Sequence, residues 1–142
     1  MTRVAGLLLA FAIAGCGWVQ GGQRPHLGIS NGTTLVVVLF VNGVEVGETR
    51  PEGPTPVIDA TGLPPLPWVV EARTVSGRVL TSMKVVEGQV WTTTRPDGGI
   101  SSSGAIGRVD LTCGRLTIWA GDAQPLGPPP APNAGQPGDC AP

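Results

Sequence analysis

The chain has 142 residues with 22 glycines and 15 prolines, and its formal net charge is −1 at pH 7. This length accommodates one small domain with tails and excludes a multidomain enzyme. A charge near zero provides no basic field for nucleic acid, and one histidine without any tyrosine leaves few side chains for acid–base catalysis.

The N-terminus has the pattern of an export signal. Met1 to Arg3 is a short basic segment, and Val4 to Ile13 is an apolar run of ten residues. A helix of that length reaches only about 15 Å, which is about half of the hydrocarbon thickness of a bilayer. The run therefore indicates a targeting signal, residues 1–15, and not a membrane span.

An aliphatic residue, two small residues and a cysteine end this signal as Ile13, Ala14, Gly15 and Cys16. In these first residues the sequence resembles bacterial lipoprotein precursors. The resemblance implies cleavage before Cys16, a diacylglyceryl group on its thiol, and a protein anchored to the bacterial cell membrane on its extracytoplasmic side. Two or more acyl chains, palmitate among them, would hold the protein stably. An ordinary secretory signal that contains a cysteine is the alternative.

The cysteine count agrees with this interpretation. Cys16, Cys113 and Cys140 make an odd number, and lipidation at Cys16 would leave a pair that oxidises outside the cytoplasm. A bridge between Cys113 and Cys140 would close a loop of roughly 28 residues and contribute about 3.5 kcal/mol to stability. Two free thiols, or a bridge to another chain, are the alternatives.

Composition divides the rest of the chain into three regions. Residues 16–27 are rich in glycine and polar residues, which predicts a lipidated flexible tether with an end-to-end distance of about 18 Å. Residues 28–121 carry short apolar runs and form the folded domain. Residues 122–142 contain seven prolines and predict an extended tail, which the Cys113–Cys140 bridge would tie back to the domain.

The first hairpin of the domain is predicted by a turn signal. Asn42-Gly43 separates the apolar runs Thr33–Val41 and Val44–Arg50, and both turn residues tolerate positive φ. Pairing across this turn places Leu39 opposite Val46. We expect one face of this hairpin to lie in the core: Leu35, Val37, Leu39, Val41, Val44 and Val46.

The other face of the first hairpin is half apolar. It carries Val36, Val38 and Phe40 beside Glu45, and therefore needs a cover or a partner. We predict that these three apolar residues form a partner surface, or that the tail or the connection 50–67 covers it. The six prolines of that connection exclude it from a central strand.

Two further hairpins follow. Trp68–Val75 and Arg78–Val86 alternate cleanly around Ser76-Gly77, with Trp68, Val70, Ala72, Val79, Met83 and Val85 expected in the core and Glu71, Arg73, Arg78, Ser82 and Lys84 in solvent. Gln89–Thr94 predicts a strand, residues 95–99 a turn, and the serine- and glycine-rich residues 98–107 a mobile loop tip. The third hairpin comprises Ile106–Thr112 and Arg115–Trp119, with Val109, Leu111, Leu116 and Ile118 facing inward.

Six or seven short strands without helical periodicity predict an all-β domain. We expect an antiparallel β-sandwich, immunoglobulin-like or similar, that ends in the proline-rich tail.

No motif for catalysis, metal or cofactor binding is present. The sequence lacks G-x-S-x-G, P-loop and H-E-x-x-H patterns, and its one imidazole, His26, lies in the tether. His26 and Met83 are too far apart in sequence to make a metal site. Four carboxylates near the first hairpin, Glu45, Glu48, Glu52 and Asp59, indicate a solvated loop. Of the tryptophans, Trp68, Trp91 and Trp119 are expected to pack in or around the core, with sugar stacking as the alternative.

The sequence thus predicts a non-catalytic protein that binds or supports something at the cell envelope. Its expected partners are the membrane, through the lipid, and an envelope protein or a glycan, but no nucleic acid. A small accessory protein for carbohydrate or peptide processing, using the loops at one end of the sandwich, is the alternative.

Overall fold

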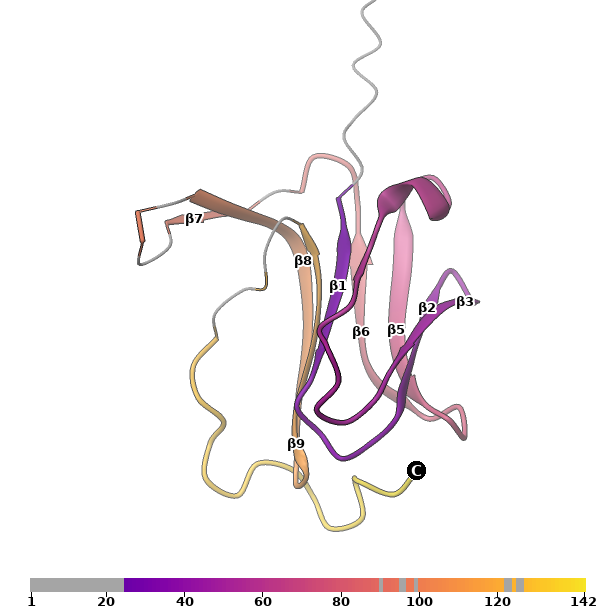
Figure 1. The fold of residues 1–142 in the computed structure, drawn as a ribbon, viewed down its shortest axis with the longest axis vertical. Helices are drawn as coiled ribbons and strands as arrows, with labels where there is room; N and C mark the ends of the chain where they lie inside the picture. Colours follow the sequence, from indigo (N-terminus) through magenta and orange to yellow (C-terminus); the bar gives the residue numbers. More distant parts are fainter. Residues whose placement is uncertain (1–24, 90, 95–96, 99, 122–123, 125–126) are drawn as a thin grey trace, which may run out of the picture.

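The computed structural model describes residues 25–89, 91–94, 97–98, 100–121, 124 and 127–142. Two antiparallel sheets pack face to face, with nine strands and one 3-10 turn in these residues (Figure 1). The predicted all-β antiparallel sandwich is therefore confirmed. No helix in the described part of the chain is long and apolar enough to cross a membrane.

The strands divide between a five-stranded and a four-stranded sheet. The first has the order β4 (Val57–Ile58), β1 (Leu27–Asn31), β9 (Gly114–Gly121), β8 (Ile100–Leu111) and β7 (Trp91–Thr94). The second has the order β3 (Val44–Thr49), β2 (Val37–Val41), β5 (Trp68–Thr74) and β6 (Val79–Val85). The 3-10 turn η1 spans Ala60–Gly62. Strands β1 and β4 were not predicted, and β1 begins at Leu27, which the sequence placed in the tether.

The core lies between the sheets, where alternate residues of each strand meet. Its fully buried members include predicted inward residues of all three hairpins: Val37, Leu39, Val41, Trp68, Val70, Ala72, Val85, Leu116 and Ile118. On one side of the sandwich β6 packs against β8 and β9. On the opposite side β3 and β4 are the edge strands of their sheets.

The first hairpin forms as predicted, with one change in register. Asn42 and Gly43 have φ of 51° and 81°, as the turn requires. A bulge at Leu39/Phe40 then sets Leu39 opposite Gly47 and not Val46. Val44 is 65% exposed, so its assignment to the core was wrong. It extends past the edge of the core, because β3 has a neighbour on one side only.

The second hairpin also contains a bulge, between Ala72 and Arg73. The irregularity places Arg73 opposite Val79 and turns Val79 outward, where it is 47% exposed. The prediction that Val79 is a core residue was therefore wrong. Leu80 packs partly against the core instead.

The serine- and glycine-rich segment 98–107 is not a loop tip. From Ile100 onward it forms the first part of β8, which pairs with β7 and β9. A Cβ atom at Gly107 would lie 3.0 Å from the carbonyl oxygen of Ser82 in β6. The absence of a side chain therefore lets the two sheets approach closely, so a composition typical of loops serves strand packing here.

Candidate functional site

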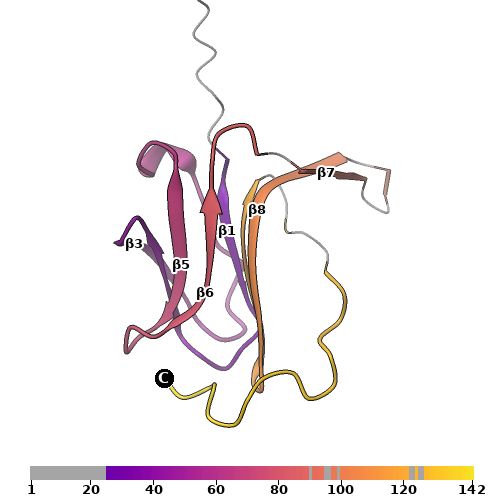
Figure 2. The same cartoon turned by 180° about the vertical axis from the view of Figure 1, so that it is seen from behind.

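The two cysteines other than Cys16 form a disulfide. Cys113 lies at the β8–β9 turn and is bonded to Cys140 in the tail, with 6.0 Å between their Cα atoms. Both side chains pack partly against the core. The predicted bridge is therefore confirmed, and it brings the tail residues 127–142, called the strap below, against one end of the sandwich (Figures 1 and 2).

Asp139 is the polar centre of the strap. Its carboxylate accepts hydrogen bonds from the Thr112 amide at 3.1 Å, the Thr112 hydroxyl at 2.5 Å and the Gln136 amide at 2.7 Å. The Thr112 hydroxyl, followed by the two amides, lowers the pKa of Asp139 below its ordinary value of 3.8. The ionised carboxylate thus fastens the strap to the β8–β9 turn.

Two arginines complete the attachment of the strap. Arg78, at the β5–β6 turn of the other sheet, donates to the carbonyl oxygens of Asp139 at 2.7 Å and Ala141 at 2.6 Å. Arg115 of β9 donates to the carbonyl oxygen of Pro128 at 2.5 Å. The strap therefore links turns from both sheets. The sequence had suggested that the tail covers the outer face around Phe40, but the hydrogen bonds of the described strap go to these turns and to β9.

The outer face around Phe40 is partly covered by a charged side chain of the same sheet. The guanidinium of Arg73 in β5 lies 4.6 Å from the centre of the Phe40 ring and forms an ion pair with Glu71. Val38 is 8% exposed. The predicted partner surface, with Val36 half-buried just before β2, is thus a mixed polar and apolar face, because a charged side chain of the neighbouring strand lies across its aromatic ring.

The connection 50–67 lies along the open side of the sandwich, where β4 pairs with β1. Asp59 caps η1 by accepting from the Thr61 amide at 2.8 Å, and this hydrogen bond lowers the pKa of Asp59. The buried indole of Trp68 donates to the carbonyl oxygen of Pro64 at 2.7 Å. These two contacts hold the connection opposite β3.

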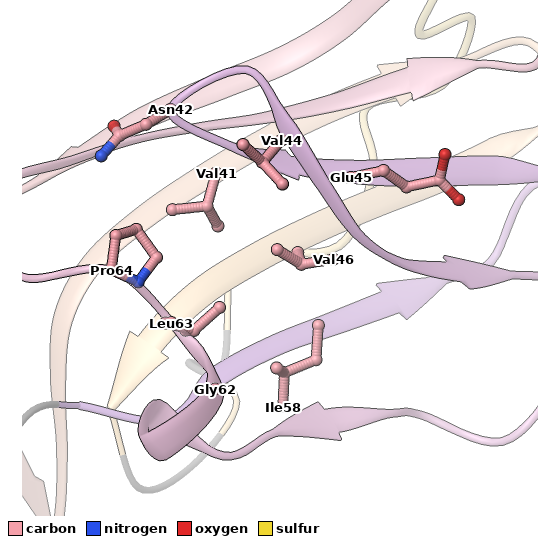
Figure 3. A pocket seen from close by; sticks show the side chains of 9 residues that line it. All are labelled: Val41, Asn42, Val44, Glu45, Val46, Ile58, Gly62, Leu63 and Pro64. Carbon is pink, nitrogen blue, oxygen red and sulfur yellow. The ribbon is translucent and has the colours of Figure 1, made fainter.

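A groove of about 480 Å³ opens between the β2–β3 hairpin and this connection (Figure 3). Its lining is mostly apolar, with two polar side chains among its residues: Val41, Asn42, Val44, Glu45, Val46, Ile58, Gly62, Leu63 and Pro64. The amide of Asn42 is already used, because it donates to the Pro67 carbonyl and accepts from the Val69 amide. In Figure 3 the Glu45 carboxylate points away from the apolar floor. The groove is suited to aliphatic side chains.

The residues considered for chemistry take structural positions. Trp68 and Trp119 are 1% and 3% exposed, so neither indole is available to stack on a sugar. The side chain of Trp91 lies outside the described residues. His26 is exposed just before β1, and its carbonyl oxygen accepts from the Gly121 amide. Met83 is in the core. No cluster of potential metal ligands occurs within the described ranges.

The sequence predicted that the bridge ties the tail back, but not the groove or the polar contacts of the strap. Ile58 and Leu63 sit in the proline-rich connection, whose composition indicated a loop, and only the short apolar pair Val57-Ile58 signalled a strand. The contacts of Asp139 with Thr112 and of Arg78 with the tail join distant segments, so no local sequence pattern predicts them.

The predicted lipidation motif Ile13, Ala14, Gly15 and Cys16, with the tether up to residue 24, lies outside the described residues, as does most of the turn predicted at residues 95–99. No family model, curated protein or solved structure matches the chain.

Proposed function

We propose that this chain is a lipid-anchored, extracytoplasmic β-sandwich protein that acts as a non-catalytic binding or structural module at the bacterial cell envelope. The Cys113–Cys140 disulfide is the observation that carries the proposal. Structural disulfides persist in oxidising compartments outside the cytoplasm. The bridge also uses both cysteines other than Cys16, the residue that the lipoprotein motif assigns to the acyl group.

The use of the ionised carboxylates supports a binding or structural role. Asp59 caps η1, Asp139 fastens the strap, and the pKa of Asp110 is lowered mainly by its hydrogen bond to Arg115 on the neighbouring strand. Each of these carboxylates holds a turn or a strand pair. The groove, in turn, offers aliphatic contact area, which suits binding better than proton transfer.

The fold also suits attachment through the N-terminus. The described chain enters the sandwich at one end, and the strap crosses the opposite end (Figure 1). A lipid on Cys16 would therefore attach the domain to the bilayer through its entry end, by way of the flexible tether. The groove on the side of the sandwich would stay accessible from the aqueous phase.

The mass of the protein extracted from membranes tests the anchor. We expect loss of residues 1–15 and an added diacylglyceryl group on Cys16, whereas a Cys16→Ser variant should leave the membrane fraction. Cys140→Ser is the matched control, because it removes a thiol and should keep the lipid mass. Recovery of the full-length, unacylated wild-type chain from the cytosol would overturn the proposal.

A further inference from the structure

Strand β3 forms an edge of the four-stranded sheet in the part of the chain that the structure describes. Strand β3 ends the order β3-β2-β5-β6, and no strand pairs with its outer edge within the described residues. In an antiparallel ladder, alternate N–H and C=O groups of such a strand point away from its partner. Its sequence, Val-Glu-Val-Gly-Glu-Thr, contains neither lysine nor proline, so the protection of this edge rests on the bulge at Val46 and on two glutamates.

The apolar groove lies directly beside this edge. Val44 is 65% exposed, and Val46 and Ile58 are partly buried where they pack against the core. Figure 3 shows the aliphatic side chains of both walls around the same space. An added strand would turn every second side chain toward this inner side, because side chains alternate along a strand. The groove would then bury those that are apolar.

The outer face of the same edge is acidic. Glu45 and Glu48 lie opposite Phe40 and Val38, whose side chains face away from the core. Arg50 lies 3.5 Å from Glu48 but is 81% exposed, and Glu52 adds a further negative charge in the adjoining turn. Cross-strand neighbours of opposite charge stabilise a sheet, so the outward side chains of an added strand are favoured to be basic.

The same charges disfavour a second copy of this chain at the edge. Antiparallel pairing of two β3 strands about their centre would set Glu45 of one copy opposite Glu48 of the other. Like charges in directly opposed positions destabilise strand pairing. A basic segment would be attracted by Glu45 and Glu48, whereas a second copy of β3 would be repelled by them.

We propose that the groove and the β3 edge bind an extended peptide segment of a partner protein, in which apolar and basic residues alternate. The segment adds to β3 as a fifth strand of that sheet, with its apolar side chains in the groove and its basic side chains beside Glu45 and Glu48. Backbone hydrogen bonds supply affinity, and the alternation supplies specificity. This inference rests on the proposed function as a binding module and names its ligand class.

Fluorescence anisotropy with designed peptides tests the proposal, using the oxidised full-length chain with Cys16→Ser. The probe is a labelled peptide of alternating valine and lysine. Two comparison peptides alternate valine with glutamate, or carry the valines and lysines of the probe in two separate blocks. We expect saturable binding of the alternating valine–lysine peptide and at least about tenfold weaker binding of both others.

Two variants locate the site. Val44→Lys, at a side chain exposed enough to leave the fold intact, should weaken binding of the probe about tenfold. Glu45→Lys should weaken the valine–lysine peptide and strengthen the valine–glutamate peptide. Glu87→Lys makes the same charge change just beyond β6, at the far edge of the sheet, and should alter neither affinity. Thermal unfolding of each variant verifies that the fold is retained.

Several results would overturn the proposal. Equal binding of the alternating peptide and of the peptide with separate valine and lysine blocks would show charge attraction without strand addition. Unchanged binding of the probe by Val44→Lys would exclude the groove as the binding site. A dimer in sedimentation that Val44→Lys dissociates would assign the edge to a second copy. None of these results affects the lipid mass at Cys16, so failure here is distinguishable from failure of the anchor.

Discussion

The strap end and the groove side of the sandwich are both bordered by proline-rich chain, yet one is fastened and the other is open. At the strap end a disulfide, the Asp139 carboxylate and the Arg78 guanidinium join the tail to turns of both sheets. On the groove side, Asp59 and Trp68 fix the connection 50–67. Strand β3 has no neighbour there among the described elements.

The difference shows what a proline-rich segment needs in order to close a sandwich. Proline has no amide hydrogen and cannot complete a ladder, so side chains must hold such a segment in place. Charged and covalent contacts from two sheets provide this for the strap. The connection is held along its own wall of the groove, which leaves the opposite edge available.

Cys140→Ser should have the largest effect, because it removes the covalent closure of the strap. We expect the free energy of unfolding to fall by about 3 kcal/mol, as measured by urea denaturation. Limited proteolysis should then cleave within residues 127–139 much faster than in the oxidised wild type. Reduction of the wild type serves as the control and should reproduce the change. Equal cleavage rates of the oxidised wild type and the Cys140→Ser variant would show that the disulfide does not hold the strap.

Gly135→Ala should come second, with Gly138→Ala as its matched control. Both glycines have positive φ, at 92° and 83°, so alanine is strained at either position by roughly 1–3 kcal/mol. Only at Gly135 would the new Cβ atom also clash with Asp139 and the Thr112 amide, whereas Gly138 has open space. The melting temperature should fall further for Gly135→Ala. An equal fall in the melting temperatures of the two variants would mean that the strap shifts at Gly135 without cost and relieves the clash.

Trp68→Phe tests the wall of the groove. Phenylalanine keeps an aromatic core side chain but loses the indole donor to the Pro64 carbonyl, at a cost of about 1–2 kcal/mol. Hydrogen exchange at the η1 amides should accelerate, while exchange at the strap amides of Gln136 and Asp139 should change little. Matching acceleration at both places would show that the two regions open together.

Acid should loosen the strap through Asp139. The folded pKa of this carboxyl lies below its ordinary value of 3.8, so its stabilising contribution is present above that pH and is lost as the pH falls through the lowered pKa. Proteolysis of the strap should therefore accelerate below pH 4 or so. An Asp139→Asn variant should be cleaved faster at neutral pH and should lose most of this pH dependence. A steep dependence that persists in the variant would point to another carboxyl group.

Val44→Thr should change stability least. The side chain is 65% exposed and extends past the core, so we expect a change within about 0.5 kcal/mol in urea denaturation. Val41→Thr, at a fully buried position of the same hairpin, should cost several times more. A large effect at Val44 would place it inside the core and would contradict an open groove.

The elements predicted well from sequence are those set by local rules. Asn42-Gly43 required positive φ and gave a hairpin turn, and the alternation around Trp68 and Val70 identified the buried face. The odd number of cysteines led to the Cys113–Cys140 pair. Each of these features depends on a few neighbouring residues, or on a count.

The features that escaped prediction depend on contacts between distant segments. The bulges that turned Val79 outward and shifted Leu39 follow from the fit to neighbouring strands. The first part of β8, up to residue 107, was taken for a loop, since its small residues serve a close approach to β6 that only the packed sheets reveal. The groove has the same origin, because Ile58 and Val46 meet only once both sheets have assembled.

The pairing of β1 with β9 has a consequence for the order of assembly. The first strand of the domain is hydrogen-bonded to the last, and His26 accepts from Gly121 at their ends. Such a sheet has high contact order, because β1 gains its second neighbour only from a strand nearly a full domain later in the chain. Until β9 is in place, β1 pairs only with β4 and β8 only with β7, so each of these two strands exposes one unpaired edge. Termination before residue 114 would therefore leave a product prone to aggregation, whatever the quality of its remaining core.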